Sequence, residues 1–149
     1  MQASEFIHIV DNTPLVSIDL IVRNPQRQIL LGLRNNRPAQ NTWFVPGGRI
    51  LKDETLDAAF ARIVQKELGL ALDRMDAAFI GVYEHFYRDN FAGVEGVTTH
   101  YVVLAHAVTL DVSQQIRADD QHASLEWMSE NEILANGQEH QNTRAYFIK

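Results

Sequence analysis

The sequence contains no cysteine among its 149 residues. This absence excludes disulfide bonds, thiolate nucleophiles and zinc sites built from cysteine. Long apolar runs are also missing: no stretch approaches the roughly 20 residues that span a bilayer, and the amino-terminal segment has no basic start followed by an apolar stretch. We therefore expect a cytoplasmic protein without a membrane span or an export signal.

Positive charge is scarce as well. Thirteen Lys and Arg residues face nineteen Asp and Glu residues, and the resulting net charge of −6 argues against a protein whose main task is to bind nucleic acid. Residues 1–75 nevertheless hold nine basic and eight acidic side chains, whereas residues 76–149 hold four and eleven. An anion site should therefore draw on the first half, where Arg34, Arg37 and Arg49 flank residues 43–48.

The length fits one domain and is too short for two domains with separate cores. With 46% hydrophobic and 21% charged residues, the composition is that of an ordinary globular protein. Repeats, low-complexity tracts and Gly/Ser/Pro-rich linkers are absent from the sequence. We interpret residues 1–149 as a single domain.

Runs of β-branched and apolar residues between turn signals predict the strands. No element is assigned before Pro14, residues 35–42 read as a polar loop, and Pro46-Gly47-Gly48 is expected to end the third strand as a turn. The predicted strands are Leu15–Val22, Ile29–Leu33, Trp43–Val45, Phe79–Tyr87, Val97–Val108 and Leu125–Met128.

Apolar residues recur at helical spacing between Thr55 and Leu68, which predicts a helix with Asp53 as its N-cap and Gly69 at its carboxyl end. A capping box at residues 129–132 starts a brief second helix, and residues 142–148 are expected to form another. Hairpin strands on both sides of a central helix indicate an α/β sandwich with a mixed sheet.

The informative segment joins Gly47 and Gly48 to the predicted helix that carries Glu67. A glycine pair lets the backbone turn tightly and approach a ligand, and a carboxylate on the inner face of the next helix can point at the same place. A turn carbonyl and one carboxylate, completed by water and phosphate oxygens, suit Mg²⁺. The other interpretation is an amphipathic helix with one inward Glu paired to an arginine.

This segment resembles the Nudix box, a spaced pattern of Gly, Glu and Arg followed by three further carboxylates. The matching residues are Gly48, Glu54, Arg62, Val64, Glu67, Gly69 and Leu70. Two carboxylates of the pattern are missing, because Ile63 and Lys66 stand at their positions. The resemblance implies a Nudix-type α/β/α sandwich.

Over nearly its full length the chain is similar to one Nudix branch, the GDP-mannose mannosyl hydrolases, which have the same depleted box. The shared stretches include residues 13–17, 36–40, 43–49, 52–54, 85–87, 99–103, 121–122 and 144–147. The resemblance implies hydrolysis of GDP-mannose, or of GDP-glucose, to GDP and free sugar by water attack at C1 with inversion. It also implies a homodimer.

The resemblance further implies roles for individual residues. One Mg²⁺, for which Mn²⁺ could substitute, would be held by the Gly47 carbonyl, Glu67 and Gln121, and His122 would be the general base. Free imidazole has a pKa of about 6.5, so a histidine beside the substrate can accept a proton from water near neutral pH. Arg34 and Arg49 would stabilise the departing diphosphate, and the substrate-binding residues would be Asp19, Arg37, His85 and Tyr101.

Structural explanations compete with some of these roles. Asp19 could lie at an exposed strand edge, and His85 and Tyr101 could be packing residues with polar tips. Glu54 and Arg62 are expected to form an ion pair that braces the loop and the helix. Two other functions stay open: a Nudix pyrophosphohydrolase that attacks phosphorus, and a nucleotide-sugar binding module without catalysis.

Overall fold

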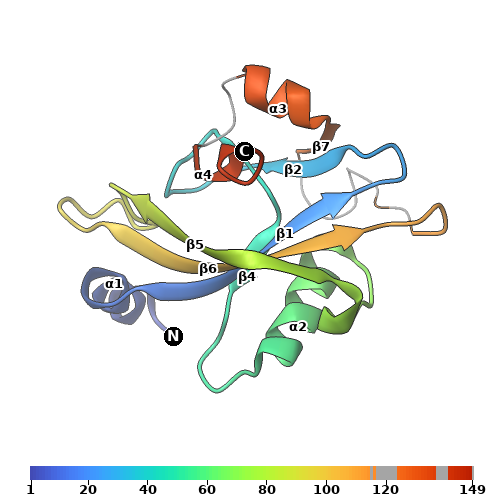
Figure 1. Cartoon of the computed structure of the whole chain (residues 1–149). Coiled ribbons are helices and arrows are strands. Elements are labelled where there is room, and N and C mark those ends of the chain that lie inside the picture. Colours follow the sequence, from blue (N-terminus) through green and yellow to red (C-terminus); the bar gives the residue numbers. More distant parts are fainter. Residues whose placement is uncertain (115, 117–123, 137–140, 149) are drawn as a thin grey trace.

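The computed structural model describes residues 1–114, 116, 124–136 and 141–148. In this part of the chain a seven-stranded mixed sheet has the main order β3-β2-β1-β6-β5, while β4 pairs with β1 and β7 pairs with β2 (Figure 1). The predicted α/β sandwich is confirmed. The strands are β1 (Leu15–Arg23), β2 (Ile29–Leu33), β3 (Trp43–Phe44), β4 (Gly47–Arg49), β5 (Ala78–Tyr87), β6 (Thr99–Thr109) and β7 (Leu125–Met128).

Strand β1 is the centre of the sheet. It pairs in parallel with β6 along its whole length, from Leu15 opposite Tyr101 to Arg23 opposite Thr109. On its other side it pairs antiparallel with β4, with Asp19 opposite Gly47. The chain thus brings the glycine pair and β1 together although about 30 residues separate them in sequence.

Alternation along β1 distributes its side chains between two layers. Ile18, Leu20 and Val22 are buried in a core cluster with residues of α2 (Leu56–Leu68), which covers one face of the sheet. The other face is covered by α3 (Glu130–Asn136) and α4 (Gln141–Arg144), and Ile21 belongs to the second core cluster there (Figure 1). Ser17 and Asp19 lie on that second face.

The helix predicted from apolar periodicity is confirmed as α2. The residues that it buries are Ala59, Phe60, Ile63, Val64 and Leu68. Its carboxyl end is also confirmed, with Gly69 in the left-handed conformation at φ 69°. The predicted N-cap was wrong. Thr55 caps the helix by accepting from Ala58 N at 3.1 Å, whereas Asp53 turns the chain at φ 67° and stands too early to do so.

Three elements were not predicted: an amino-terminal helix, strand β4 and a short 3₁₀ helix after α2. Helix α1 (Ala3–Asn12) begins with a capping box between Gln2 and Glu5, within a segment to which the sequence analysis assigned nothing. The expected turn at Gly47 is strand β4 instead, and bonds from Leu20 N to Pro46 O and from Ile50 N to Val16 O, both 2.8 Å, extend its ladder with β1. The carboxyl-terminal helix is shorter than expected and ends at Arg144.

A short 3₁₀ helix (Arg74–Asp76) joins α2 to β5. Within the described residues no helix combines the length and the apolar character that a membrane span requires.

The position of Ile63 generates a stability prediction. Ile63 is 1% exposed, and a Cβ on Gly48 would lie 3.1 Å from its Cγ1. Ile63→Glu restores the box carboxylate but buries a charge against backbone and apolar side chains, so the free energy of unfolding should fall by at least about 2 kcal/mol. Urea denaturation measures this loss.

The matched control is Lys66→Glu, which restores the other missing carboxylate at an exposed position of the same helix. Its free energy of unfolding should stay within about 0.5 kcal/mol of the parent value. Equal stability of both variants would contradict the burial argument.

Candidate functional site

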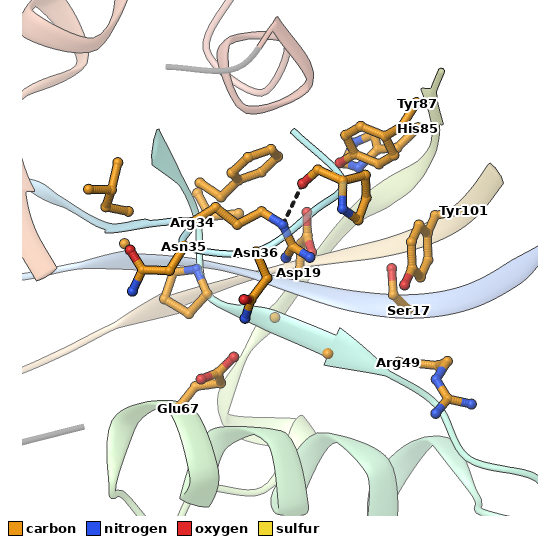
Figure 2. A pocket seen from close by; sticks show the side chains of 18 of the residues that line it. Ser17, Asp19, Arg34, Asn35, Asn36, Arg49, Glu67, His85, Tyr87 and Tyr101 are labelled. Atoms are coloured by element: carbon orange, nitrogen blue, oxygen red, sulfur yellow. Dashed lines mark hydrogen bonds between the residues drawn. The ribbon is translucent and has the colours of Figure 1, made fainter. Parts of the chain in front are cut away.

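A pocket of about 340 Å³ opens where β1, β2, β4, β5 and β6 meet the carboxyl half of α2. Figure 2 shows Glu67 rising from α2 on one side, His85 and Tyr87 on the opposite side, and Arg34 between them. The predicted site residues that line this pocket are Asp19, Arg34, Gly47, Arg49, Glu67, His85 and Tyr101. The structure thus brings together residues from four strands, the loop after β2 and one helix.

The floor of the pocket is built by β1 and the glycine turn. Ser17 and Asp19 point to the pocket face of β1, and Ser17 is 6% exposed. A Cβ at position 47 would lie 2.5 Å from Asp19 Oδ1 and 2.6 Å from Ile18 O. Only glycine therefore allows the backbone of β4 to approach Asp19 this closely.

Burial raises the pKa of Asp19 to about 7, and the hydrogen bond from Tyr146 opposes that rise. The carboxyl group is not at an exposed strand edge, so the structural explanation considered for Asp19 is wrong. A cation in the pocket would favour the ionised form of this group.

The two predicted arginines are fixed by contacts that leave their charge available. Arg34 donates from Nε to Pro38 O at 2.7 Å and from Nη2 to Arg37 O at 3.2 Å, and its guanidinium lies 5.9 Å from the ring centroid of Phe44. The guanidinium of Arg49 lies 4.3 Å from the ring centroid of Phe6 in α1. These partners are carbonyls and rings, which do not neutralise a cation.

An ion pair braces the connection between β4 and α2, as predicted. Arg62 donates to both oxygens of Glu54, at 2.7 and 3.0 Å, and its Nη2 also donates to Arg49 O at 2.8 Å. The bonds from Arg62 and from Leu51 N lower the pKa of Glu54 to about 2. Because this pair joins the end of β4 to the helix, it fixes Arg49 relative to Glu67.

The metal hypothesis can be tested against the donors present. Glu67 lines the pocket together with Gly47 and Gly48. Ile63 lies buried beneath Gly48, and Lys66 is exposed on the outer side of α2. No three His, Asp or Glu side chains gather as a metal cluster among the residues that the structure describes. The Glu67 carboxylate and the Gly47 carbonyl are oxygen donors of the same pocket, a set that fits one hard cation and does not fit several.

The wall opposite Glu67 is aromatic and polar. His85 is 6% exposed, and burial raises the pKa of Tyr87 to about 12. Burial also raises the pKa of Tyr101, whereas the positive charges of Arg34 and Arg49 lower it. Tyr101 thus lies within the field of both arginines, where an anionic ligand would also be attracted.

Three predicted residues have other outcomes. The exposed Arg37 is absent from the pocket lining, and a Cβ on Gly93 would lie 2.9 Å from its Nη1, so its head group lies against the loop before β6. Gln121 and His122 fall outside the described residues, so their roles stay predictions.

Ser17, Tyr87 and Phe6 belong to the surroundings of the site but were not predicted from the sequence. Ser17 could have been found, because it and Asp19 are the polar residues at alternate positions of an apolar strand. Tyr87 stands two residues after His85 and therefore faces the same side of β5. No sequence pattern indicated a role for Phe6, because its contact with Arg49 joins two segments that are far apart in the chain.

Comparisons with known proteins agree with this architecture. The family model of the NUDIX domain matches residues 13–149. The low-salt glycan biosynthesis protein Agl8 of Haloferax volcanii is 43% identical over 122 residues, which are 81% of this chain and 74% of that protein. The chain belongs to the Nudix family and is classed with its hydrolases.

Solved structures share the fold. The MutT protein of Methanosarcina mazei Go1 superposes with a TM-score of 0.70 at 22% identity, covering 91% of this chain and 92% of that one. The NUDIX domain of Shewanella oneidensis NrtR, crystallised with ADP ribose, gives 0.61 at 17% identity, covering 99% and 100%. Helix α1, with Phe6, precedes the range that the family model matches.

Proposed function

We propose that the chain hydrolyses GDP-mannose or GDP-glucose to GDP and free sugar, by water attack at C1 with inversion. The observation that carries the proposal is where three side chains of α2 face, those of residues 63, 66 and 67. Ile63 is buried, Lys66 is exposed, and Glu67 lines the pocket.

The number of carboxylates that α2 presents to the pocket helps to decide between attack at phosphorus and attack at the sugar carbon. Nudix enzymes generally use divalent metal ions such as Mg²⁺ or Mn²⁺. Attack at phosphorus with several such ions needs several carboxylates to hold them, whereas attack at the sugar carbon mainly needs a stabilised leaving group. The depleted α2 and the two available arginines favour attack at carbon.

The residues that would hold the metal are Gly47, through its carbonyl, Glu67 and Gln121. One Mg²⁺ there, or Mn²⁺ in its place, would supply charge neutralisation for the leaving diphosphate. Arg34 and Arg49 would bind the same group from the β2 and β4 sides, and their fixed positions cost little reorganisation as charge develops.

The remaining residues would serve the sugar and the attacking water. The water oxygen bonds to C1, the bond from C1 to the diphosphate oxygen breaks with its electron pair leaving on GDP, and His122 takes the water proton. Asp19 would contact the sugar, His85 and Tyr101 would each bind a sugar or phosphate oxygen, and Arg37 would contact the leaving group or the guanine. The 43% identical relative is named as a glycan biosynthesis protein, which supports a substrate from nucleotide-sugar chemistry.

The experiment that tests the proposal is hydrolysis of GDP-mannose in ¹⁸O-water, with mass spectrometry of both products. Attack at carbon places the label on the C1 hydroxyl of the sugar and leaves GDP unlabelled. Label in a phosphate would favour the pyrophosphohydrolase instead. Binding without turnover would favour the non-catalytic binding module.

A second prediction concerns Glu67→Gln. Loss of an outer-shell partner of a metal site typically costs 10–100-fold in affinity or activity, so loss of a ligand should lower kcat and weaken Mg²⁺ binding at least about that much. Steady-state kinetics at varied Mg²⁺ measures both. The control is Asp57→Asn, an exposed carboxylate in the first turn of the same helix, which should change neither. Unchanged kinetics in Glu67→Gln would refute the metal site.

We also propose a homodimer, supported by the apolar surface of the edge strand β5. Phe79, Val82 and Phe86 are 58%, 60% and 59% exposed. Their partners on β6 are His106, Leu104 and His100, which alternate along that strand, so the three side chains share one face of the sheet. Exposed apolar clusters of this kind often mark protein interfaces.

Sedimentation equilibrium tests the dimer. The parent protein should sediment as a dimer at micromolar concentration, and Val82→Glu as a monomer because a charge would be buried in the interface. Met75→Glu is the control, since Met75 is 96% exposed outside β5. A monomeric parent, or a dimeric Val82→Glu, would contradict this proposal.

A further inference from the structure

The carboxyl-terminal segment of the described chain packs over the pocket side of the sheet. Thr143 Oγ1 donates to Trp43 O at 3.3 Å, and Arg144 Nη2 donates to Leu134 O at 2.9 Å. Phe147 is 6% exposed within the second core cluster. These contacts on both sides fix the position of Tyr146.

Tyr146 links two pocket residues that come from different strands. Its hydroxyl donates to Asp19 Oδ2 at 2.6 Å, and the same oxygen lies 3.3 Å from His85 Nε2. Asp19 is on β1 and His85 is on β5, with β6 between these strands. The ring of Tyr146 packs edge-on against Tyr83, with centroids 4.6 Å apart.

The proton of the phenol sets the direction of these hydrogen bonds. A phenol has one proton, and here it is donated to the carboxylate of Asp19. Burial and the nearby charge of Asp19 raise the pKa of Tyr146, so the phenol stays protonated. His85 must then donate from Nε2 to the phenol oxygen, which gives a chain from His85 through Tyr146 to Asp19.

The chain also fixes which oxygen of Asp19 faces the glycine turn. Oδ2 is held by Tyr146, whereas Oδ1 lies so close to the Gly47 backbone that a Cβ there would be 2.5 Å away. Among the residues that the structure describes, Tyr146 is the hydrogen-bond partner of the Asp19 side chain, so without the phenol hydroxyl no hydrogen bond there would oppose rotation of the carboxylate about its last bond.

We propose that Tyr146 is a positioning residue whose hydroxyl holds the Asp19 carboxylate and the His85 imidazole in the orientation that receives the hexose of the substrate. The identity of the ligand rests on the proposed function. The orienting role rests on the hydrogen bonds of Tyr146 alone.

The test is Tyr146→Phe, which keeps the ring and removes one oxygen. Hydrogen bonds to charged groups contribute enough that kcat/KM for GDP-mannose should fall about 10- to 100-fold. The dissociation constant of GDP with Mg²⁺ should stay within about twofold, because Arg34, Arg49 and the metal bind the diphosphate in the proposed site and neither arginine contacts Tyr146. Tyr83→Phe, which alters the neighbouring ring, is the matched control and should leave both constants within about twofold.

A double-mutant cycle tests whether Tyr146 acts through Asp19. The double variant Tyr146→Phe/Asp19→Asn should lose less kcat/KM than the two single losses combined, because with Asp19 replaced only the orientation of His85 remains for Tyr146 to supply. Additive losses would overturn the proposal, and so would a GDP affinity that falls as far as kcat/KM does.

Nitrogen-15 NMR of labelled histidine supplies a readout that does not depend on turnover. His85, assigned by comparison with His85→Gln, should show protonated Nε2 in the parent protein, and this resonance should shift in Tyr146→Phe while the melting temperature changes little. An unchanged His85 resonance would overturn the hydrogen-bonded chain. If the parent protein does not hydrolyse GDP-mannose, the proposed function fails, and the His85 resonance still decides the role of Tyr146.

Discussion

The close approach of the Gly47-Gly48 backbone to β1 and α2 is the constraint on which the pocket depends. A side chain at position 47 would collide with Asp19 and with the carbonyl of Ile18, and one at position 48 would press on Ile63. With glycine at both positions, β4 pairs with β1, and the ion pair of Glu54 and Arg62 fixes the following turn against the helix. The floor of the pocket, Glu67 and Arg49 thereby become parts of one rigid arrangement.

The electrostatics of the pocket follow from how its cations are held. Arg34 is oriented by carbonyls of its own loop, and Arg49 by an aromatic ring of α1. Neither contact cancels the charge, so both guanidiniums remain attractive to an anion. On the opposite wall the polar groups of Asp19, Tyr146 and His85 satisfy one another, which lets polar side chains lie buried without a large penalty.

Local pattern predicted much of the fold. The periodicity of α2 and the apolar runs of β2 and β7 needed no long-range information, and both strands have the predicted bounds. The prediction of a turn at Gly47 was wrong because the residues of β4 pair with β1, a strand distant in sequence. This pairing overrode the turn signal of Pro46 and the two glycines. Thr55, not Asp53, caps the helix. Thr55 has the extended backbone of an N-cap residue, whereas Asp53 has a positive φ.

In the site, too, local sequence patterns predicted one part, and contacts between distant segments determined the rest. The box spacing and the shared stretches predicted residues that line one pocket, but not the links between them. The bond from Tyr146 to Asp19 joins positions 127 residues apart, and no periodicity or spacing encodes such a contact. Arg37 shows the converse, since it is next to Arg34 and the pocket in sequence but lies against the loop before β6 in the fold, and its binding role stays a prediction.

The burial of Ile63 has a consequence for how this chain can evolve. A carboxylate at that position is incompatible with the core that now surrounds it, while the core residues and Gly48 have become complementary to an apolar side chain. Replacing Ile63 alone by a carboxylate would destabilise the protein. Several neighbouring residues would have to change together to accommodate a carboxylate there without that loss of stability. The packing of α2 therefore opposes the return of a carboxylate at position 63 and keeps Glu67 as the α2 carboxylate that lines the pocket.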